Sequence, residues 1–193
     1  MGKQAPPLLA GALAIALAAG VADARAQPRR SAAVFISPSG EPFRPTPGGP
    51  APFDVWFSRV DARHEGRIDR AEFRADAIAF FRRLDANGDG VIDGFEISAY
   101  EMTIAPELNE QTDAGGAGRA YYALLNEPEP VSGADLALDL RISLAEWLAA
   151  TDRRFDLLDV RKSGFLDHDA LVGRLPKATR AGLAPAKTGK DRP

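Results

Sequence analysis

Cysteine is absent from the chain, and histidine occurs only twice among its 193 residues. Disulfide bonds and thiolate metal sites are therefore excluded, and zinc or copper centres built on imidazole are not expected. A basic excess is also absent, because 24 Lys and Arg stand against 27 Asp and Glu, for a net charge of -3. A nucleic-acid-binding domain would carry such an excess, so no nucleic acid partner is expected. The 45% of apolar residues is still sufficient for a buried core.

The N-terminal segment lacks the length of a membrane span. An apolar run from Leu8 to Ala22 follows Lys3 and leads to the small residues around Ala24 and Ala26. This is the layout of a secretory signal peptide, with cleavage after Ala24 or Ala26. A span needs about 20 apolar residues. We therefore expect residues 1–26 to be removed and the protein to lie in the periplasm or outside the cell, without a stable membrane span.

The remaining chain divides by composition into three parts. Residues 27–52 hold seven prolines, which favours an extended arm, although Val34, Phe35 and Ile36 form an apolar island within it. Residues 53–175 show helical periodicity, and residues 176–193 form a polar, mildly basic tail that we expect to be disordered. A hypothesis follows for the island: it docks into a groove of the helical body.

Residues 85–96 carry the most specific motif of the chain. They match the D-x-[DN]-x-[DN]-G-x5-E template of a calcium-binding loop at every required position. Calcium prefers six to eight oxygen ligands at about 2.3–2.6 Å, and a tight loop can supply them from alternating positions. Gly90 stands where the backbone bends sharply. The predicted ligands of this second loop are Asp85, Asn87, Asp89, the Val91 carbonyl, Asp93 (through a water) and the bidentate Glu96.

The motif recurs three times in degenerate form. A first loop spans residues 61–72, a third spans 135–146 and a fourth spans 159–170. The loop starts differ by 24 residues within each pair, and the two pairs are offset by 74, which indicates an internal duplication. The apolar positions Ile68, Ile92, Ile142 and Leu166 recur at the equivalent place, where a short strand of each loop would pair with a sister loop.

On these motifs the chain resembles the EF-hand superfamily, and in particular exported bacterial proteins with four loops in two closely spaced pairs. The resemblance covers residues 53–175 and implies calcium binding through helix–loop–helix units. The first loop departs from the pattern at Arg63, a cation where an oxygen is expected, but it keeps a weaker ligand set. That set consists of Asp61, Glu65, the Arg67 carbonyl, Asp69 and Glu72.

The other two loops depart further. Ala137 has no ligand atom, Leu140 replaces the bending glycine, and Ala170 removes the closing carboxylate of the fourth loop. We expect the third and fourth loops to be structural partners without metal.

The short distance between paired loops constrains the architecture. Residues 69–84 and 143–158 are each expected to form one shared helix. A rod of this length spans about 24 Å, so the loops at its two ends cannot pair with each other. If the rods are antiparallel, the first loop pairs with the fourth and the second with the third. The resulting fold class is an all-α EF-hand array with short inter-loop β-pairing.

The sequence therefore predicts an exported calcium-binding protein in which the ion has a structural or buffering role. Sensor proteins open a methionine-rich groove, whereas Met102 is the only methionine left after signal removal. The alternative is a calcium-modulated interaction module with a protein partner in the cell envelope. An enzyme is not expected, since no nucleophile–base pair is visible and His64 and His168 stand at non-ligand loop positions, where exposure is expected.

Overall fold

The computed structural model describes residues 2, 34–108, 124–125, 127, 129–175 and 180. The signal peptide predicted for residues 1–26 and the tail predicted for 176–193 lie, apart from Gly2 and Arg180, outside the described residues. None of the helices in the described ranges is long and apolar enough to cross a bilayer.

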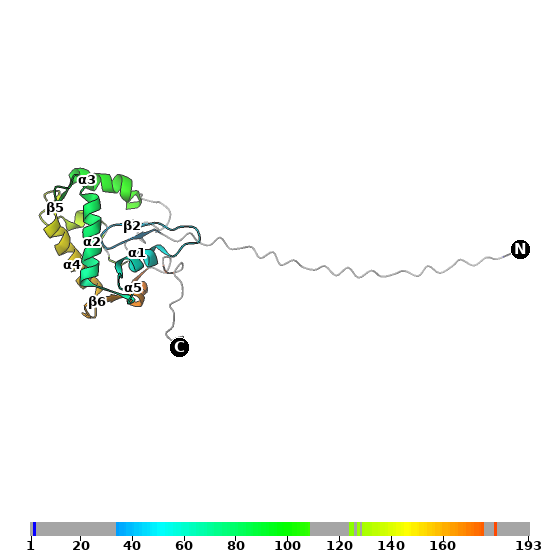
Figure 1. The fold of residues 1–193 in the computed structure, drawn as a ribbon. Helices are drawn as coiled ribbons and strands as arrows, with labels where there is room; N and C mark the ends of the chain where they lie inside the picture. Colours follow the sequence, from blue (N-terminus) through cyan, green and yellow to red (C-terminus); the bar gives the residue numbers. More distant parts are fainter. Residues whose placement is uncertain are drawn as a thin grey trace.

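Two long helices, α2 (Arg70–Leu84) and α4 (Leu144–Leu158), lie side by side (Figure 1). Each begins with a capping box, in which the side chain of Asp69 or Ser143 accepts from the backbone three residues on, and a glutamate reaches back. The Trp147 indole donates to the Ala77 carbonyl at 2.8 Å and joins the first turn of α4 to the middle of α2. Both shared helices predicted from the loop spacing are thus confirmed.

Short strands join the loops in antiparallel pairs. Strand β3 (Arg67–Asp69) pairs with β6 (Phe165–Asp167), and β4 (Val91–Asp93) pairs with β5 (Arg141–Ser143). Ile68 lies opposite Leu166 and Ile92 opposite Ile142, all of them buried. The first loop therefore meets the fourth and the second meets the third, as predicted. This arrangement requires α2 and α4 to run antiparallel.

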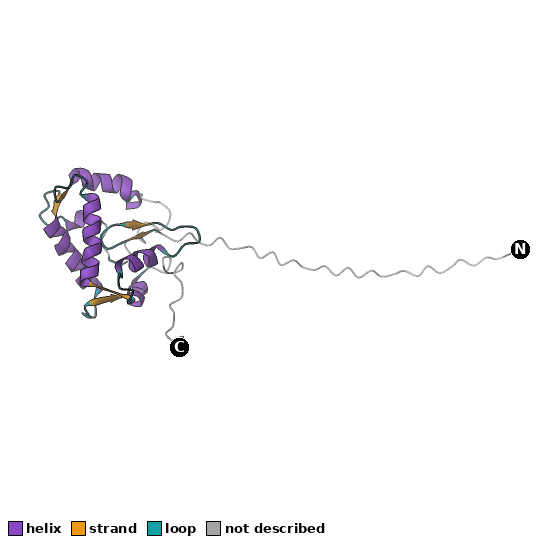
Figure 2. Cartoon of the chain, viewed as in Figure 1, coloured by secondary structure: helices purple, strands orange, loops and turns teal. Residues whose placement is uncertain are grey.

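The predicted all-α class is wrong. The described residues form small antiparallel sheets as well as helices (Figure 2), including a hairpin of β1 (Phe35–Ile36) and β2 (Pro42–Phe43) outside the four loops. The proline-rich composition concealed this hairpin, because prolines are compatible with short edge strands and turns as well as with an open arm. The fold is a mixture of helices and short two-stranded sheets.

Shorter helices surround the two rods. Helix α1 (Pro52–Val60) precedes the first loop, and α5 (His168–Arg174) follows the strand of the fourth. The second loop leads into α3 (Gly94–Ala99), which continues as a π-helical turn, η1 (Tyr100–Ile104). Two 3-10 turns, η2 (Pro106–Leu108) and η4 (Ser132–Ala134), complete the described helical segments.

The core consists of two clusters, one near each pair of loops. Trp56, Phe73 and Phe155 belong to the cluster on the side of the first and fourth loops. Phe80 and Trp147 belong to the cluster on the side of the second and third loops. Burial of these aromatic side chains is the main driving force for the fold.

The hairpin is part of this core. Phe35 is only 1% exposed, and its ring lies 5.4 Å from those of both Phe53 and Trp56. Ile36 is buried as well, whereas Val34 is partly exposed. The predicted docking of the apolar island is confirmed for Phe35, which belongs to the first core cluster, whereas Ile36 is buried but belongs to neither cluster. These residues belong to the hairpin, and Phe35 packs against α1. This part of the proline-rich segment therefore does not extend away from the body.

Candidate metal site

The second loop begins at the end of α2 and is shaped by one carboxylate. The backbone N–H of Asp85 ends the helix by donating to the Phe81 carbonyl. The Asp85 side chain then accepts from the backbone N–H groups of Gly88 (2.8 Å), Asp89 (3.1 Å) and Gly90 (2.9 Å). Gly90 has φ of +84°, a conformation that costs a residue with a side chain about 1–2 kcal/mol. Asp85 and Gly90 together fold the chain back on itself.

The far end of the loop is closed by Glu96. Its Oε1 accepts from the N–H groups of Ala86 (2.8 Å) and Asn87 (3.3 Å), at the start of the loop. Its Oε2 accepts from the Asp93 N–H at 3.0 Å, while the Asp93 carboxylate caps α3. One glutamate thus connects the beginning of the loop with its end.

In the middle of the loop, side-chain oxygens also accept from backbone N–H groups, here only two residues further on. The Asn87 side-chain oxygen accepts from the Asp89 N–H at 2.8 Å, and Asp89 in turn accepts from the Val91 N–H at 2.9 Å. The Asn87 amide also donates to Asp89 at 3.2 Å. Backbone hydrogen bonds therefore orient the predicted side-chain ligands, and Val91 lies in the ladder opposite Ser143.

The charges of the second loop are not balanced locally. Asp85, Asp89, Asp93 and Glu96 are four carboxylates in one loop, and none of them forms an ion pair with a described Lys, Arg or His side chain. Carboxylates that accept only neutral hydrogen bonds repel one another across the loop. A bound cation would remove this repulsion.

The first loop carries its own cation. The Arg63 guanidinium lies 2.5 Å from Asp69 and 3.3 Å from Glu72, two of the predicted ligands. The backbone N–H of Glu72 and the Arg63 side chain hold the pKa of Asp69 below its ordinary value. Glu65 is paired with Arg67 at 3.1 Å. Of the five predicted ligands, three are therefore engaged by arginine side chains that would have to move for a metal ion to bind.

The third and fourth loops keep the fold of the loop without its ligand set. Asp135 accepts from the Leu140 N–H at 2.9 Å, and Asp159 accepts from the Gly164 N–H at 2.7 Å. The same bond joins Asp61 to Gly66 at 2.8 Å in the first loop. The first aspartate of every loop thus has a structural role that is independent of any metal. Leu140 adopts φ of +61° where the second loop has Gly90.

Within the described residues, no three His, Asp or Glu side chains are clustered closely enough to form a ready-made metal cage. In the second loop, carboxylate oxygens of Asp85, Asp89 and Glu96 accept from backbone N–H groups. Of the three remaining predicted ligands, the Asp93 carboxylate caps α3, and the Asn87 amide and the Val91 carbonyl are not acidic groups.

His168 occupies a more specific place than the sequence suggested. It begins α5, its Nε2 lies 2.9 Å from the Asp54 carboxylate of α1, and its ring contacts that of Phe57 at 4.9 Å. The side chain is 33% exposed. The expectation of an exposed loop residue is therefore wrong for His168, which fastens α5 to α1, and holds for His64. No periodicity connects positions 54 and 168, so only the tertiary structure reveals this contact.

No protein-family model matches the chain, and no curated protein is similar enough to count as a match. A function for the second loop must therefore be argued from its own residues.

Proposed function

We propose that the chain binds one calcium ion in the second loop, residues 85–96. The observation that carries this proposal is the set of four carboxylates without an ionic partner among the described residues, held in one loop by backbone hydrogen bonds. Asp85, Asn87, Asp89 and Glu96 would contribute side-chain oxygens, Val91 its carbonyl, and Asp93 a water-mediated contact. Hard oxygen donors of this kind suit calcium better than softer transition metals.

The other loops support the assignment by contrast. Arg63 and Arg67 offset the acidic groups of the first loop, so any binding there would compete with ion pairs already formed. The third and fourth loops lack complete donor sets at Ala137 and Ala170. We therefore propose that these three loops act chiefly as structural partners of the second.

A structural or buffering role fits this arrangement. Loops of this chemistry bind calcium with dissociation constants from about 10⁻⁹ to 10⁻³ M, and extracellular modules lie at the weak end. At a hundredfold excess of calcium over the dissociation constant, binding would add about 2.7 kcal/mol to the free energy of unfolding. Such a gain would matter for a fold without disulfide bonds.

A second candidate function is calcium-modulated binding of a protein partner. The observation that favours it is a set of exposed apolar side chains in the second and third loops, which pair through β4 and β5: Phe95 is 88% exposed, Leu138 86% and Leu140 70%. Exposed apolar side chains that form a contiguous patch mark interaction sites. Affinity capture from envelope extract, with calcium or with a chelator, tests this candidate. The candidate is supported if the parent chain retains partners that Leu138→Asp loses. It is refuted if both chains capture the same proteins.

Isothermal titration calorimetry of the purified chain with calcium tests the leading proposal. We expect one binding event, abolished by Glu96→Gln because an amide cannot supply two charged oxygens. Glu146→Gln is the matched control, since Glu146 closes the third loop in the same way but without a full ligand set. Equal heats for the parent chain and both variants, or no heat at millimolar calcium, would refute the site.

A further inference from the structure

The helix that leaves the second loop is fixed to the body mainly through Tyr100. Helix α3 has no buried residue, and Tyr100 is the buried residue of the π-helical turn that continues it. The Tyr100 ring is 1% exposed and meets Phe80 of α2 edge-on at 6.2 Å. Ile97 and Ile104 add partly buried contacts with the same cluster. The direction in which the helix leaves the loop therefore depends on how Tyr100 is held.

The β1–β2 hairpin holds Tyr100 directly. The tyrosine hydroxyl donates to the Gly40 carbonyl at 2.7 Å in a buried contact. Gly40 has φ of +95°, and a Cβ atom there would stand 2.9 Å from the hydroxyl oxygen and 3.1 Å from Val131. Arg44 also donates to the Ile104 carbonyl at 2.7 Å. The hairpin thus contacts both ends of η1, and its glycine permits the close approach.

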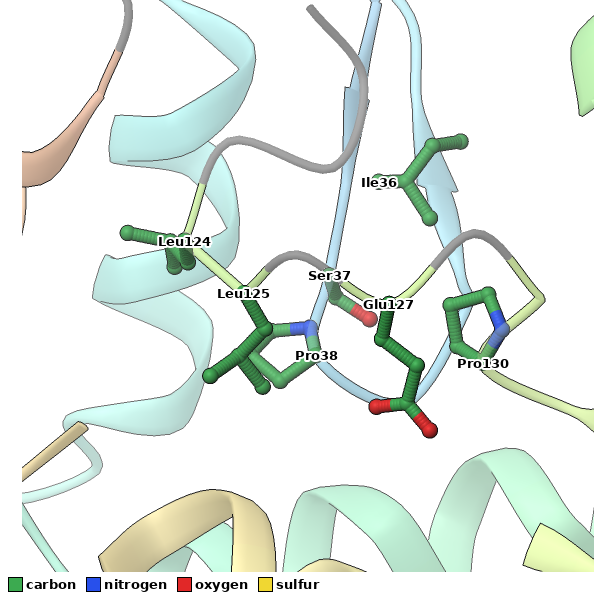
Figure 3. A pocket seen from close by; sticks show the side chains of 7 residues that line it. All are labelled: Ile36, Ser37, Pro38, Leu124, Leu125, Glu127 and Pro130. Carbon is green, nitrogen blue, oxygen red and sulfur yellow. The ribbon is translucent and has the colours of Figure 1, made fainter. Parts of the chain in front are cut away.

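The hairpin is itself firmly attached to other parts of the molecule. Glu41 is buried and forms ion pairs with Arg59 of α1, at 2.5 Å, and with Arg83 of α2. On its other side, Ile36 and Pro38 line, together with Leu124 and Pro130, a cavity of only about 10 Å³ (Figure 3). Ion pairs therefore attach the hairpin to α1 and α2, and the position of these two helices determines where the hairpin holds Tyr100.

Tyr100 also connects to the loop itself. Its backbone N–H donates to the carbonyl of Glu96, one helical turn earlier. With the hairpin docked, the Glu96 carboxylate already reaches across to Ala86 and Asn87 at the start of the loop. The contact between Tyr100 and the hairpin therefore fixes the helix that carries Glu96, the residue that connects the end of the loop with its start.

We propose that the docked hairpin raises the calcium affinity of the second loop by holding Tyr100, and with it Glu96, in the closed position. The inference rests on the proposed calcium site and assigns a regulator to it. Coupling between two sites is reciprocal, so calcium in the loop also tightens the hairpin on the body.

Calorimetry on the full chain tests the coupling with Tyr100→Phe, which removes the hydroxyl but keeps the ring. We expect calcium to bind more weakly, by at most about fivefold, because one buried hydrogen bond is worth about 1 kcal/mol and only the part of it gained on calcium binding changes the affinity. Gly40→Ala, which interferes with the same contact from the hairpin side, should weaken binding at least as much. Ser98→Ala is the control, because it removes an exposed hydroxyl bond to Gly94 on the same helix without touching the hairpin. Its affinity should equal that of the parent chain.

The outcomes separate the two proposals. If the parent chain takes up no calcium, the proposed function fails. If it binds calcium and both Tyr100→Phe and Gly40→Ala bind as tightly as Ser98→Ala, the coupling is refuted while the site stands. Hydrogen exchange of residues 34–44, followed by mass spectrometry, gives an independent result. Calcium should slow exchange in this segment of the parent chain, and equal rates with calcium and chelator would also refute the coupling.

Discussion

Replacing Phe35 by alanine would test how far the hairpin contributes to the core. Phe35 is 1% exposed and its ring contacts those of Phe43 at 6.3 Å and of Phe53 and Trp56 at 5.4 Å. Substitutions of this type in a packed core cost about 3–5 kcal/mol, the sum of lost burial and of the cavity left behind. We expect a loss in this range for Phe35→Ala, since the hairpin, α1 and the first core cluster meet at this side chain.

The assay is urea unfolding followed by circular dichroism and by tryptophan fluorescence, with Trp56 as the reporter next to the mutated ring. At a slope of about 2 kcal/mol per molar urea, the midpoint would fall by about 1.5–2.5 M. Phe95→Ala is the matched control, because it removes the same ring from a site that is 88% exposed. Its free energy of unfolding should change by no more than about 0.5 kcal/mol. A Phe35→Ala variant as stable as Phe95→Ala would refute the packing described for the hairpin.

Two further predictions concern the loops. Gly90→Ala should lower the free energy of unfolding by about 1 kcal/mol, and Leu140→Gly should raise it by about 0.5–1 kcal/mol. Both positions have positive φ, which favours glycine over residues with a side chain. Changes of the opposite sign in thermal unfolding would contradict this. Acid should destabilise the chain through Glu146 and Asp159. Hydrogen bonds from Ser143 lower the pKa of Glu146. Burial opposes the charge of Asp159, but backbone N–H groups outweigh it and its pKa is also lowered. Both groups thus stabilise the fold above their unfolded pKa values of about 4, and this contribution is lost as the pH falls through the folded values. Unfolding at constant ionic strength should show a smaller loss below pH 4 for Glu146→Gln than for the parent chain, and parallel profiles would contradict the assignment.

The long helices and the pairing of the loops could be predicted from the sequence because local signals and geometry agree there. The stripe of Phe73, Phe80 and Phe81 defines one face of α2, and Asp69 marks its start. A rod of this length separates the loops at its ends, which leaves only pairing between rods. The spacing of the four loop motifs is therefore enough to predict which loops pair, without knowledge of any tertiary contact.

The hairpin, by contrast, depends on contacts between distant residues. Ser37 accepts from the Glu41 N–H at 3.0 Å to form its turn, but Glu41 is buried only because Arg59 and Arg83 meet it from two helices. Arg154 is a similar case, since this arginine is 1% exposed and pairs with Glu127 at 2.7 Å. Composition favours a solvated position for such charged residues, and only their partners make burial possible.

The residues of the candidate site come from the sequence template, and their binding of a metal ion stays a prediction. The template identified the oxygen donors of the second loop, and it also marked Asp61, Asp135 and Asp159, whose carboxylates accept loop N–H groups whether or not a metal is bound. The difference between the loops lies in the arginine partners of the first, and Arg63 pairs with Glu72 nine residues away in the sequence. The sequence showed a cation at position 63, and the structure adds which carboxylates, Asp69 and Glu72, it pairs with.

The central claim, a calcium ion in the second loop, is tested most directly by residue-resolved NMR. The amide of Gly90 donates to the Asp85 carboxylate, so a cation bound to that carboxylate should polarise the bond and shift the amide resonance. We predict a saturable shift of Gly90 on calcium titration, together with its neighbours in 85–96, and little change at Leu140 in the equivalent position of the third loop. An unmoved Gly90 resonance at millimolar calcium would contradict the claim.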